Sequence, residues 1–139
     1  MKTWLVDTGP IVAWLDAADA AHERVATKLD AFKGQLVTTS AVITEAMHFA
    51  GDDSRGPRHL VEWVSASRLA VYDFCQPLEL RAAVALMERY PDVPMDFADA
   101  TLLLLAEAAK SHDILTLDRR GFSTFRTREG RPLRLVLDR

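Results

Sequence analysis

Two carboxylates in this sequence stand where a buried strand would end. Asp7 follows the apolar residues 4–6, and Asp118 follows the apolar run at residues 114–117. Short apolar runs of this kind, bounded by turn residues, are typical of strands in the interior of a sheet. In open α/β sheets, ligands bind in the crevice outside the carboxyl ends of the strands. If the two strands are parallel neighbours, Asp7 and Asp118 share one crevice.

Two further carboxylates lie on helices that are otherwise apolar. Residues 97–110 include four consecutive leucines, which face every side of a helix and therefore indicate a buried one. Asp99 lies in the first turn of this helix. Glu45 projects at the edge of the apolar face of a helix expected at residues 40–50. Because an unpaired charge is costly to bury, both carboxylates need an explanation.

Each acid also has an ordinary structural explanation. An Asp just before a helix is commonly an N-cap, which fits Asp7 and also Asp96, ahead of the leucine-rich helix. Asp99 could close an acidic capping box with Asp96, and Glu45 could reach solvent along the flank of its helix. Six other aspartates lie in turns or polar stretches and need no special explanation: Asp16, Asp19, Asp52, Asp53, Asp92 and Asp138. The capping and functional interpretations are both open on this evidence.

Together, such acids would bind a metal ion. Two carboxylates about 4 Å apart repel each other by roughly 4 kcal/mol at an effective dielectric constant of about 20. A divalent cation supplies the missing counter-charge. All-oxygen ligation without convergent His or Cys selects a hard ion, Mg²⁺ or Mn²⁺, which commonly contacts substrate phosphate. The acids therefore predict cleavage of phosphodiester bonds.

Alternating strands and helices must position these acids. The hydrophobic period switches repeatedly between the strand and the helix value, which predicts an α/β fold with a mainly parallel sheet flanked by helices. Gly34, Gly51 and Pro91 mark ends of helices. The expected strands are residues 2–6, 35–38, 69–73, 113–117 and 133–137, and the expected helices are 9–17, 21–32, 40–50, 57–67, 77–90 and 97–110.

Length and composition favour one compact domain covering residues 1–139. The chain has 139 residues, 49% of them hydrophobic, which is enough for a sizeable core without disulfides or structural metal. Its one cysteine, Cys75, cannot form an internal disulfide, and the four histidines show no paired ligand spacing. The sequence lacks a secretory signal pattern and an apolar run of the roughly 18 residues that a membrane span needs. We expect a cytoplasmic protein with no membrane segment.

The charge is distributed unevenly along the chain. Residues 1–118 contain ten Lys and Arg against eighteen Asp and Glu, whereas residues 119–139 contain seven Arg against Glu129 and Asp138. A basic segment therefore follows an acidic body. Such a segment either contacts phosphate or an acidic partner, or it forms a solvated face paired with the acids of the body.

Four stretches of the sequence together resemble one known family. They are LVDTGPIVAWL, TTSAVITEAMHFA, PMDFADATLLLLAE and ILTLDRRGF, in that order and spread over nearly the whole chain. Their order and context resemble the PIN-domain nucleases, and within these the VapC-like toxins of toxin and antitoxin pairs. The resemblance implies a three-layer α/β/α fold with a central, mainly parallel sheet of about five strands, and with acids from different elements meeting at one end of the sheet.

The resemblance also implies roles for individual residues. The acids that match the metal-binding and catalytic carboxylates of the family are Asp7, Glu45, Asp99 and Asp118. Asp96 matches less regularly and is expected to be an auxiliary ligand acting through water, and Thr8 and Thr116 match polar neighbours that support the site. The implied cofactor is one or two Mg²⁺ or Mn²⁺ ions, and the implied reaction is endonucleolytic hydrolysis of RNA that leaves 5′-phosphate and 3′-hydroxyl ends.

The family also implies partners other than the RNA substrate. A homodimer is expected, bound to a small antitoxin whose tail covers the acidic crevice by presenting Arg or Lys where the metal would bind. Exposed apolar side chains on the helices between residues 40 and 67 are candidates for this partner surface.

Other functions fit the sequence less well. The Asp-Thr-Gly at residues 7–9 also occurs in aspartic proteases, but their fold is nearly all strand. A phosphoacceptor receiver domain would need an adjacent acidic pair near the N-terminus and a lysine after the last strands. Two alternatives stay open: a PIN-like module that binds RNA or protein without cleavage, and an RNA-processing nuclease outside a toxin pair. Four mutually repelling acids argue against the first, and a neighbouring antitoxin reading frame would decide the second.

Overall fold

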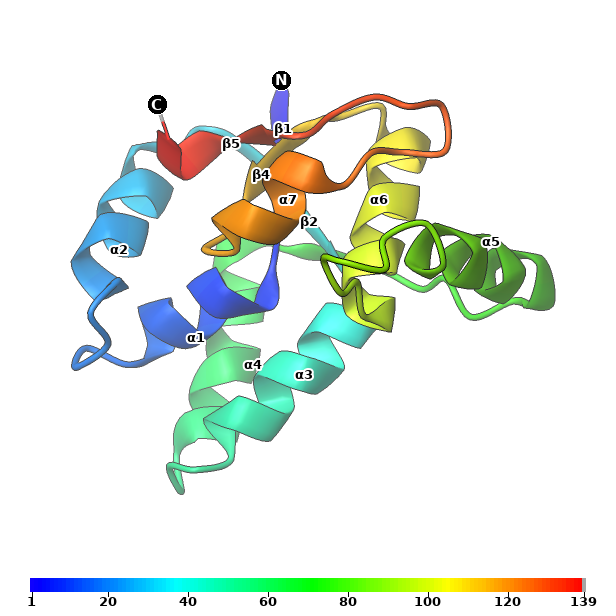
Figure 1. Cartoon of the computed structure of the whole chain (residues 1–139). Helices are drawn as coiled ribbons and strands as arrows, with labels where there is room; N and C mark the ends of the chain where they lie inside the picture. The colour runs from blue at the N-terminus through cyan, green and yellow to red at the C-terminus, as the bar shows by residue number, and fades with distance from the viewer. Residues whose placement is uncertain (139) are drawn as a thin grey trace.

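The centre of the molecule is a sheet of five parallel strands in the order β3-β2-β1-β4-β5 (Figure 1). The structure is a computed structural model, and it describes residues 1–138. The α/β class and the mainly parallel sheet predicted from the sequence are confirmed. The strands are β1 (Lys2–Val6), β2 (Gly34–Thr39), β3 (Ala70–Tyr72), β4 (Asp113–Leu115) and β5 (Arg134–Leu135).

Helices connect the strands and cover both faces of the sheet. Right-handed crossovers place the helices that follow β1 and β2 on one face and those that follow β3 on the other. Figure 1 shows α1, α2 and α4 on the opposite side of the sheet from α5 and α6. The helices of the described chain are α1 (Thr8–Leu15), α2 (His22–Ala31), α3 (Ser40–Ala50), α4 (Gly56–Ser67), α5 (Pro77–Met87), α6 (Phe97–Ala109) and α7 (Arg119–Thr124), and a short 3₁₀ helix, η1, covers Val136–Asp138.

The strand order reverses at β1. The chain runs from β1 outward to β2 and β3, and then returns to the other side of β1 for β4 and β5. Leu5 pairs with Val37 of β2 and with Ile114 of β4, so both neighbours run parallel to β1. Such a reversal leaves a crevice outside the carboxyl ends of the two central strands. In this chain, Asp7 lies at that position on β1.

The core is built around β1 and α6. All four leucines at residues 102–105 are at most 4% exposed, which confirms the prediction that this helix is buried on every side. Burying one leucine side chain contributes roughly 1.5–3 kcal/mol. The helix that carries Asp99 is therefore fixed by packing along its length, and its first turn has a defined position relative to the sheet.

The C-terminal region differs from the sequence prediction. The strand expected at residues 133–137 is only two residues long, because Val136 and Leu137 turn into η1 and bury their side chains there. The strand expected at 113–117 ends at Leu115, and α7 follows it as a helix that the sequence did not predict. The helix expected at 77–90 ends at Met87. At the C-terminal end, the apolar pattern indicated that Val136 and Leu137 are buried, and a short helical turn buries them as well as a strand would.

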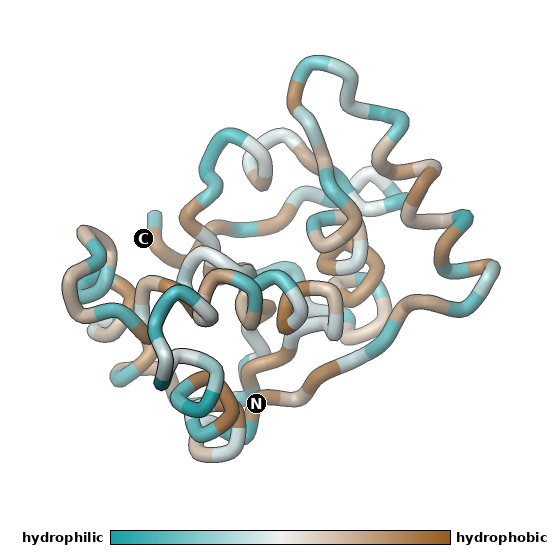
Figure 2. The backbone as a smooth tube through the Cα atoms, turned by 90° about the horizontal axis from the view of Figure 1, so that it is seen from below, coloured by the Kyte–Doolittle hydropathy of each residue, from teal (hydrophilic) through white to brown (hydrophobic). Residues whose placement is uncertain are grey.

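The helix α5 lies at the edge of the molecule. It is at the right of both Figure 1 and Figure 2, where hydrophobic and hydrophilic segments alternate along it. Leu78 is 80% exposed and Val84 is 50% exposed, while Ala83 and Leu86 of the same helix are buried. No helix within residues 1–138 has both the length and the apolar character needed to cross a bilayer.

Candidate functional site

Asp7 is held at the end of β1 by three hydrogen bonds. Its backbone N–H donates to the carbonyl oxygen of Leu115 in β4. Its Oδ1 accepts from the backbone N–H of Thr8 at 2.8 Å, and its Oδ2 accepts from the hydroxyl of Thr116 at 2.7 Å. Asp7 is the N-cap of α1, as the structural interpretation of the sequence proposed. Capping uses only Oδ1, and the hydrogen bond from Thr116 fixes Oδ2.

The surroundings of Asp7 disfavour its charged form. The side chain is buried, and this burial is the main reason that its pKa is raised to about 6. The hydrogen bonds from Thr116 and Thr8 lower the pKa again, whereas the charges of Asp118 and Glu45 raise it further. Asp7 therefore lies close enough to two of the other predicted acids to interact with their charges.

Thr116 connects the acids of the two central strands. Its hydroxyl oxygen accepts a hydrogen bond from the backbone N–H of Asp118 at 3.0 Å while it donates to Asp7. Asp118 in turn caps α7, because its Oδ1 accepts from the N–H of Gly121 at 2.9 Å. A Cβ atom at Gly121 would collide with the Asp118 carboxylate, so a larger residue at this position would force that side chain to move.

Asp96 and Asp99 form the start of α6. The side chain of Asp96 accepts from the N–H of Asp99 at 2.8 Å, and the side chain of Asp99 accepts from the N–H of Asp96 at 3.1 Å. This is the capping box expected from the sequence. Burial is the largest reason that the pKa of Asp99 is raised to about 8, and the charges of Asp96 and Asp7 add to the shift.

Glu45 reaches the same region from α3. The first turn of α3 is tied to α6 by a 2.8 Å hydrogen bond between the hydroxyls of Thr39 and Thr101. This contact fixes the relative position of the helices that carry Glu45 and Asp99. Glu45 is half-buried, which agrees with its expected position at the edge of the apolar face of the helix.

All five predicted acids line one open cleft of about 510 Å³. Thr8 also lines the cleft, whereas Thr116 does not line it and contacts the site through its hydrogen bond to Asp7. The sequence assigned no role to Asp19, but the structure places this residue in the lining of the cleft, in the turn between α1 and α2. The Asp19 side chain caps a local turn by accepting from the N–H of Ala21, and its local sequence carries no signal that the turn folds toward the crevice.

The chemistry of the cleft fits a hard divalent cation. Its polar side chains are carboxylates and a hydroxyl, the ligands that Mg²⁺ and Mn²⁺ prefer. The Thr8 hydroxyl is buried and makes no hydrogen bond within the described part of the chain, so it can serve a water or another ligand in the cleft. Within residues 1–138, no three Asp, Glu, His or Cys side chains are already close enough together to hold a metal ion. Holding an ion would therefore require some of these carboxylates to lie closer together than in this structure.

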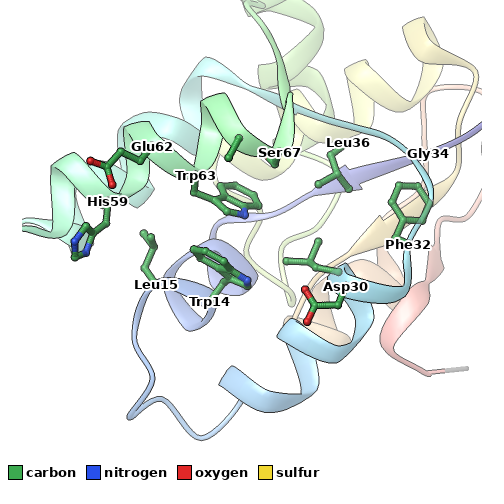
Figure 3. A pocket seen from close by; sticks show the side chains of 12 residues that line it. Trp14, Leu15, Asp30, Phe32, Gly34, Leu36, His59, Glu62, Trp63 and Ser67 are labelled. Carbon is green, nitrogen blue, oxygen red and sulfur yellow. The ribbon is translucent and has the colours of Figure 1, made fainter.

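A second recess, of about 630 Å³, lies between α1, α2 and α4 (Figure 3). Trp14 of α1 and Trp63 of α4 face each other in it, with ring centroids 5.8 Å apart. Asp30 and Glu62 add two carboxylates to this largely apolar lining.

The fold and the acidic cleft define a known class of protein. The sequence model of the PIN domain matches residues 4–127. The chain therefore belongs to the PIN-domain family, as its four sequence stretches predicted.

Individual relatives narrow the class further. Ribonuclease VapC26 of Mycobacterium tuberculosis is 30% identical in an alignment 130 residues long, and the match covers 88% of this chain and 91% of that protein. The crystal structure of Mycobacterium tuberculosis VapC20, a toxin that cleaves the sarcin-ricin loop, matches with a TM-score of 0.70 and 20% identity, over 83% of this chain and 89% of that one. A toxin-antitoxin complex from Klebsiella pneumoniae matches with a TM-score of 0.65 and 19% identity, over 87% and 91% of the two chains. The resemblance to VapC-like proteins is thus confirmed.

Proposed function

We propose that this protein is a divalent-metal-dependent endoribonuclease and the toxin of a toxin-antitoxin pair. The observation that carries the proposal is the meeting of Asp7, Glu45, Asp99 and Asp118 in one cleft at the switch point of the sheet. The ribonuclease name of the 30% identical relative supports the choice of RNA as substrate.

The four acids would hold one or two Mg²⁺ or Mn²⁺ ions, with Asp96 assisting through water. A bound ion of this kind lowers the pKa of water and stabilises charge on phosphate oxygens. Thr116 keeps the Asp7 carboxylate oriented and favours its ionised form. The capping box holds the Asp99 side chain at the N-terminus of α6. The cleft is open, which allows an extended RNA strand to pass through it.

Cleavage by purified single variants tests this proposal. Asp7→Asn, Glu45→Gln, Asp99→Asn and Asp118→Asn should each abolish or severely reduce RNA cleavage while the circular dichroism spectrum stays native. Asp52→Asn is the matched control, because Asp52 is exposed in the turn after α3 and lies outside the cleft. Full activity in all four variants would exclude the assigned site. RNA binding by the wild type without cleavage at any metal concentration would favour the alternative of a non-cleaving module.

An antitoxin partner fits the second recess. The apolar pair Trp14 and Trp63, with Asp30 and Glu62 beside it, complements a segment that combines apolar and basic side chains. The recess and the acidic cleft both border α1, whose eight residues span roughly 12 Å. One antitoxin segment following α1 would therefore fill the recess and bring an Arg or Lys to the acids.

This part of the proposal is tested by expressing the chain with the small reading frame next to its gene. Recovery of an inactive complex of the two proteins would support the proposal. The Trp63→Ala variant should then fail to bind the partner. A neighbouring protein that neither binds nor inhibits would instead favour an RNA-processing nuclease outside a toxin pair.

We also propose a homodimer. Phe49 of α3 and Val61 of α4 are 50% and 56% exposed, so the expected candidates between residues 40 and 67 do include apolar side chains at the surface. Light scattering during size-exclusion chromatography measures the mass directly, and a monomer at all concentrations would contradict this assignment.

A further inference from the structure

The arginines of the basic C-terminal segment do not share one environment. Three of them form ion pairs with acids: Arg119 with Asp138, Arg128 with Glu107, and Arg134 with Asp113. These pairs match the interpretation of the segment as a solvated face that neutralises the body. Arg120 and Arg131 are exposed and take part in none of the ion pairs found among residues 1–138.

The two arginines lie at opposite ends of the strands. Arg131 lines a recess together with His112 and Asp113, at the amino-terminal end of β4. Arg120 belongs to α7, the helix that begins directly after Asp118 at the carboxyl end of β4. Because all the strands are parallel, their carboxyl ends lie on one side, and of the two arginines Arg120 is the one on the side where the acids meet.

Arg120 connects two chain segments that each contain an acid of the cleft. Its Nη2 donates to the backbone carbonyl oxygen of Asp92 at 3.2 Å. Asp92 belongs to the loop that leads into Asp96, while Arg120 itself follows Asp118, and both Asp96 and Asp118 line the cleft. The contact holds the guanidinium against the loop that leads into Asp96. A carbonyl oxygen carries no net charge, so the positive charge and the other N–H donors of Arg120 stay available.

An RNA strand entering this cleft meets an electrostatic obstacle. Six Asp and Glu side chains line the cleft, and none of the described residues that line it is Lys, Arg or His. Metal ions would offset the acids at the scissile phosphate, but the neighbouring phosphates still need cationic contacts. An arginine binds phosphate well because its planar donors can form two parallel charge-assisted hydrogen bonds.

We propose that Arg120 is a substrate-positioning residue that binds a backbone phosphate of single-stranded RNA at the rim of the cleft. This inference rests on the proposed ribonuclease function, and it assigns a role to a residue of the basic segment. Arg120 would act through binding and not through the chemical step, so its loss should raise KM far more than it lowers kcat.

Binding of a fluorescein-labelled single-stranded oligouridylate, followed by fluorescence anisotropy in EDTA, tests the contact without cleavage. Arg120→Gln should weaken binding, and the slope of log K against log salt concentration should fall by about 0.7, the value for one phosphate contact on a single strand. Arg120→Lys should restore much of the slope, because it keeps the charge. Arg131→Gln removes the same charge at the opposite end of the strands and should leave the slope unchanged.

The outcomes separate this inference from the proposed function. An unchanged slope in Arg120→Gln, or an equal loss in Arg131→Gln, would overturn the role of Arg120, as would wild-type binding that does not depend on salt. Unchanged KM for RNA cleavage in Arg120→Gln would do the same while leaving the ribonuclease function intact. Salt-dependent RNA binding that requires Arg120, in a protein that never cleaves RNA, would support the contact and refute the nuclease. If Arg120→Gln does not fold, the salt slope and KM can still be compared between Arg120→Lys and the wild type.

Discussion

The hydroxyl of Thr116 donates a 2.7 Å hydrogen bond to Oδ2 of Asp7, 109 residues earlier in the chain, and both partners are buried. The bond joins the ends of the two central strands. It also favours the ionised form of a carboxylate that burial would otherwise keep protonated.

Thr116→Val should therefore shift the pH dependence of cleavage. Losing the hydroxyl removes an interaction that lowers the pKa of Asp7, so the acidic limb of the pH-rate profile should move to higher pH. The free energy of unfolding should fall by about 1–3 kcal/mol, because a charged acceptor and the N–H of Asp118 lose their partner. Thr116→Ser keeps the hydroxyl and should restore the wild-type profile. Identical profiles for the wild type and the valine variant would show that Asp7 does not limit the rate.

Stability of the metal-free protein should fall as pH rises from about 4 to about 8. The pKa values of Asp7 and Asp99 are raised to about 6 and about 8 in the folded protein, so the native state binds more protons than the unfolded chain. Their contribution to stability is full below the unfolded pKa and is lost as pH passes the folded values. Urea denaturation in EDTA at several pH values measures this slope. Asp99→Asn should flatten it, whereas a wild-type stability that rises steadily over this range would contradict the pKa shifts.

Metal binding should raise the melting temperature. Mn²⁺ or Mg²⁺ at a hundred times its Kd adds about 2.7 kcal/mol if it binds only the native state. The effect should be largest above the raised pKa of Asp99, about 8, and fade at low pH, because protonated acids do not ligate. In Asp99→Asn the metal-free protein should melt higher than the wild type and the shift should shrink, while Asp52→Asn should behave like the wild type. Equal melting temperatures with and without saturating metal would mean that the acids do not form a common site.

Gly121→Ala should damage the site through its turn. The added methyl group would collide with the Asp118 carboxylate and lie 3.0 Å from the ring of Phe125. We expect a loss of about 1–3 kcal/mol in the free energy of unfolding and reduced cleavage, because Asp118 must move. Gly9→Ala is the control for stability, since its Cβ would meet Leu117 at an ordinary 3.5 Å. Comparable stability of the two variants would show that the turn adapts without cost.

Local sequence patterns predicted the end of β1 at Val6 beside Asp7, whereas β4 ends at Leu115, two residues before the expected end, and Asp118 still lines the same cleft. An apolar run followed by Asp places a carboxylate at the edge of a sheet, and parallel pairing of β1 and β4 then brings Asp7 and Asp118 together. The pattern did not reveal Asp19, because only the path of the α1–α2 turn in space brings it to the cleft. It also missed α7, a helix too short to show an amphipathic period, and with it the position of Arg120. The metal role of the acids is still a prediction.

Three acids of the cleft, Asp7, Asp96 and Asp118, are also N-caps, of α1, α6 and α7 respectively. Asparagine caps a helix about as well as aspartate, but it lacks the charge that a cation requires. In the genetic code, Asp and Asn codons differ at a single base. A single-base change from Asp to Asn at any of the three positions would therefore remove a charge from the site with little loss of stability. Lineages that keep the scaffold as a binding protein would be expected to carry Asn there more often than Ala.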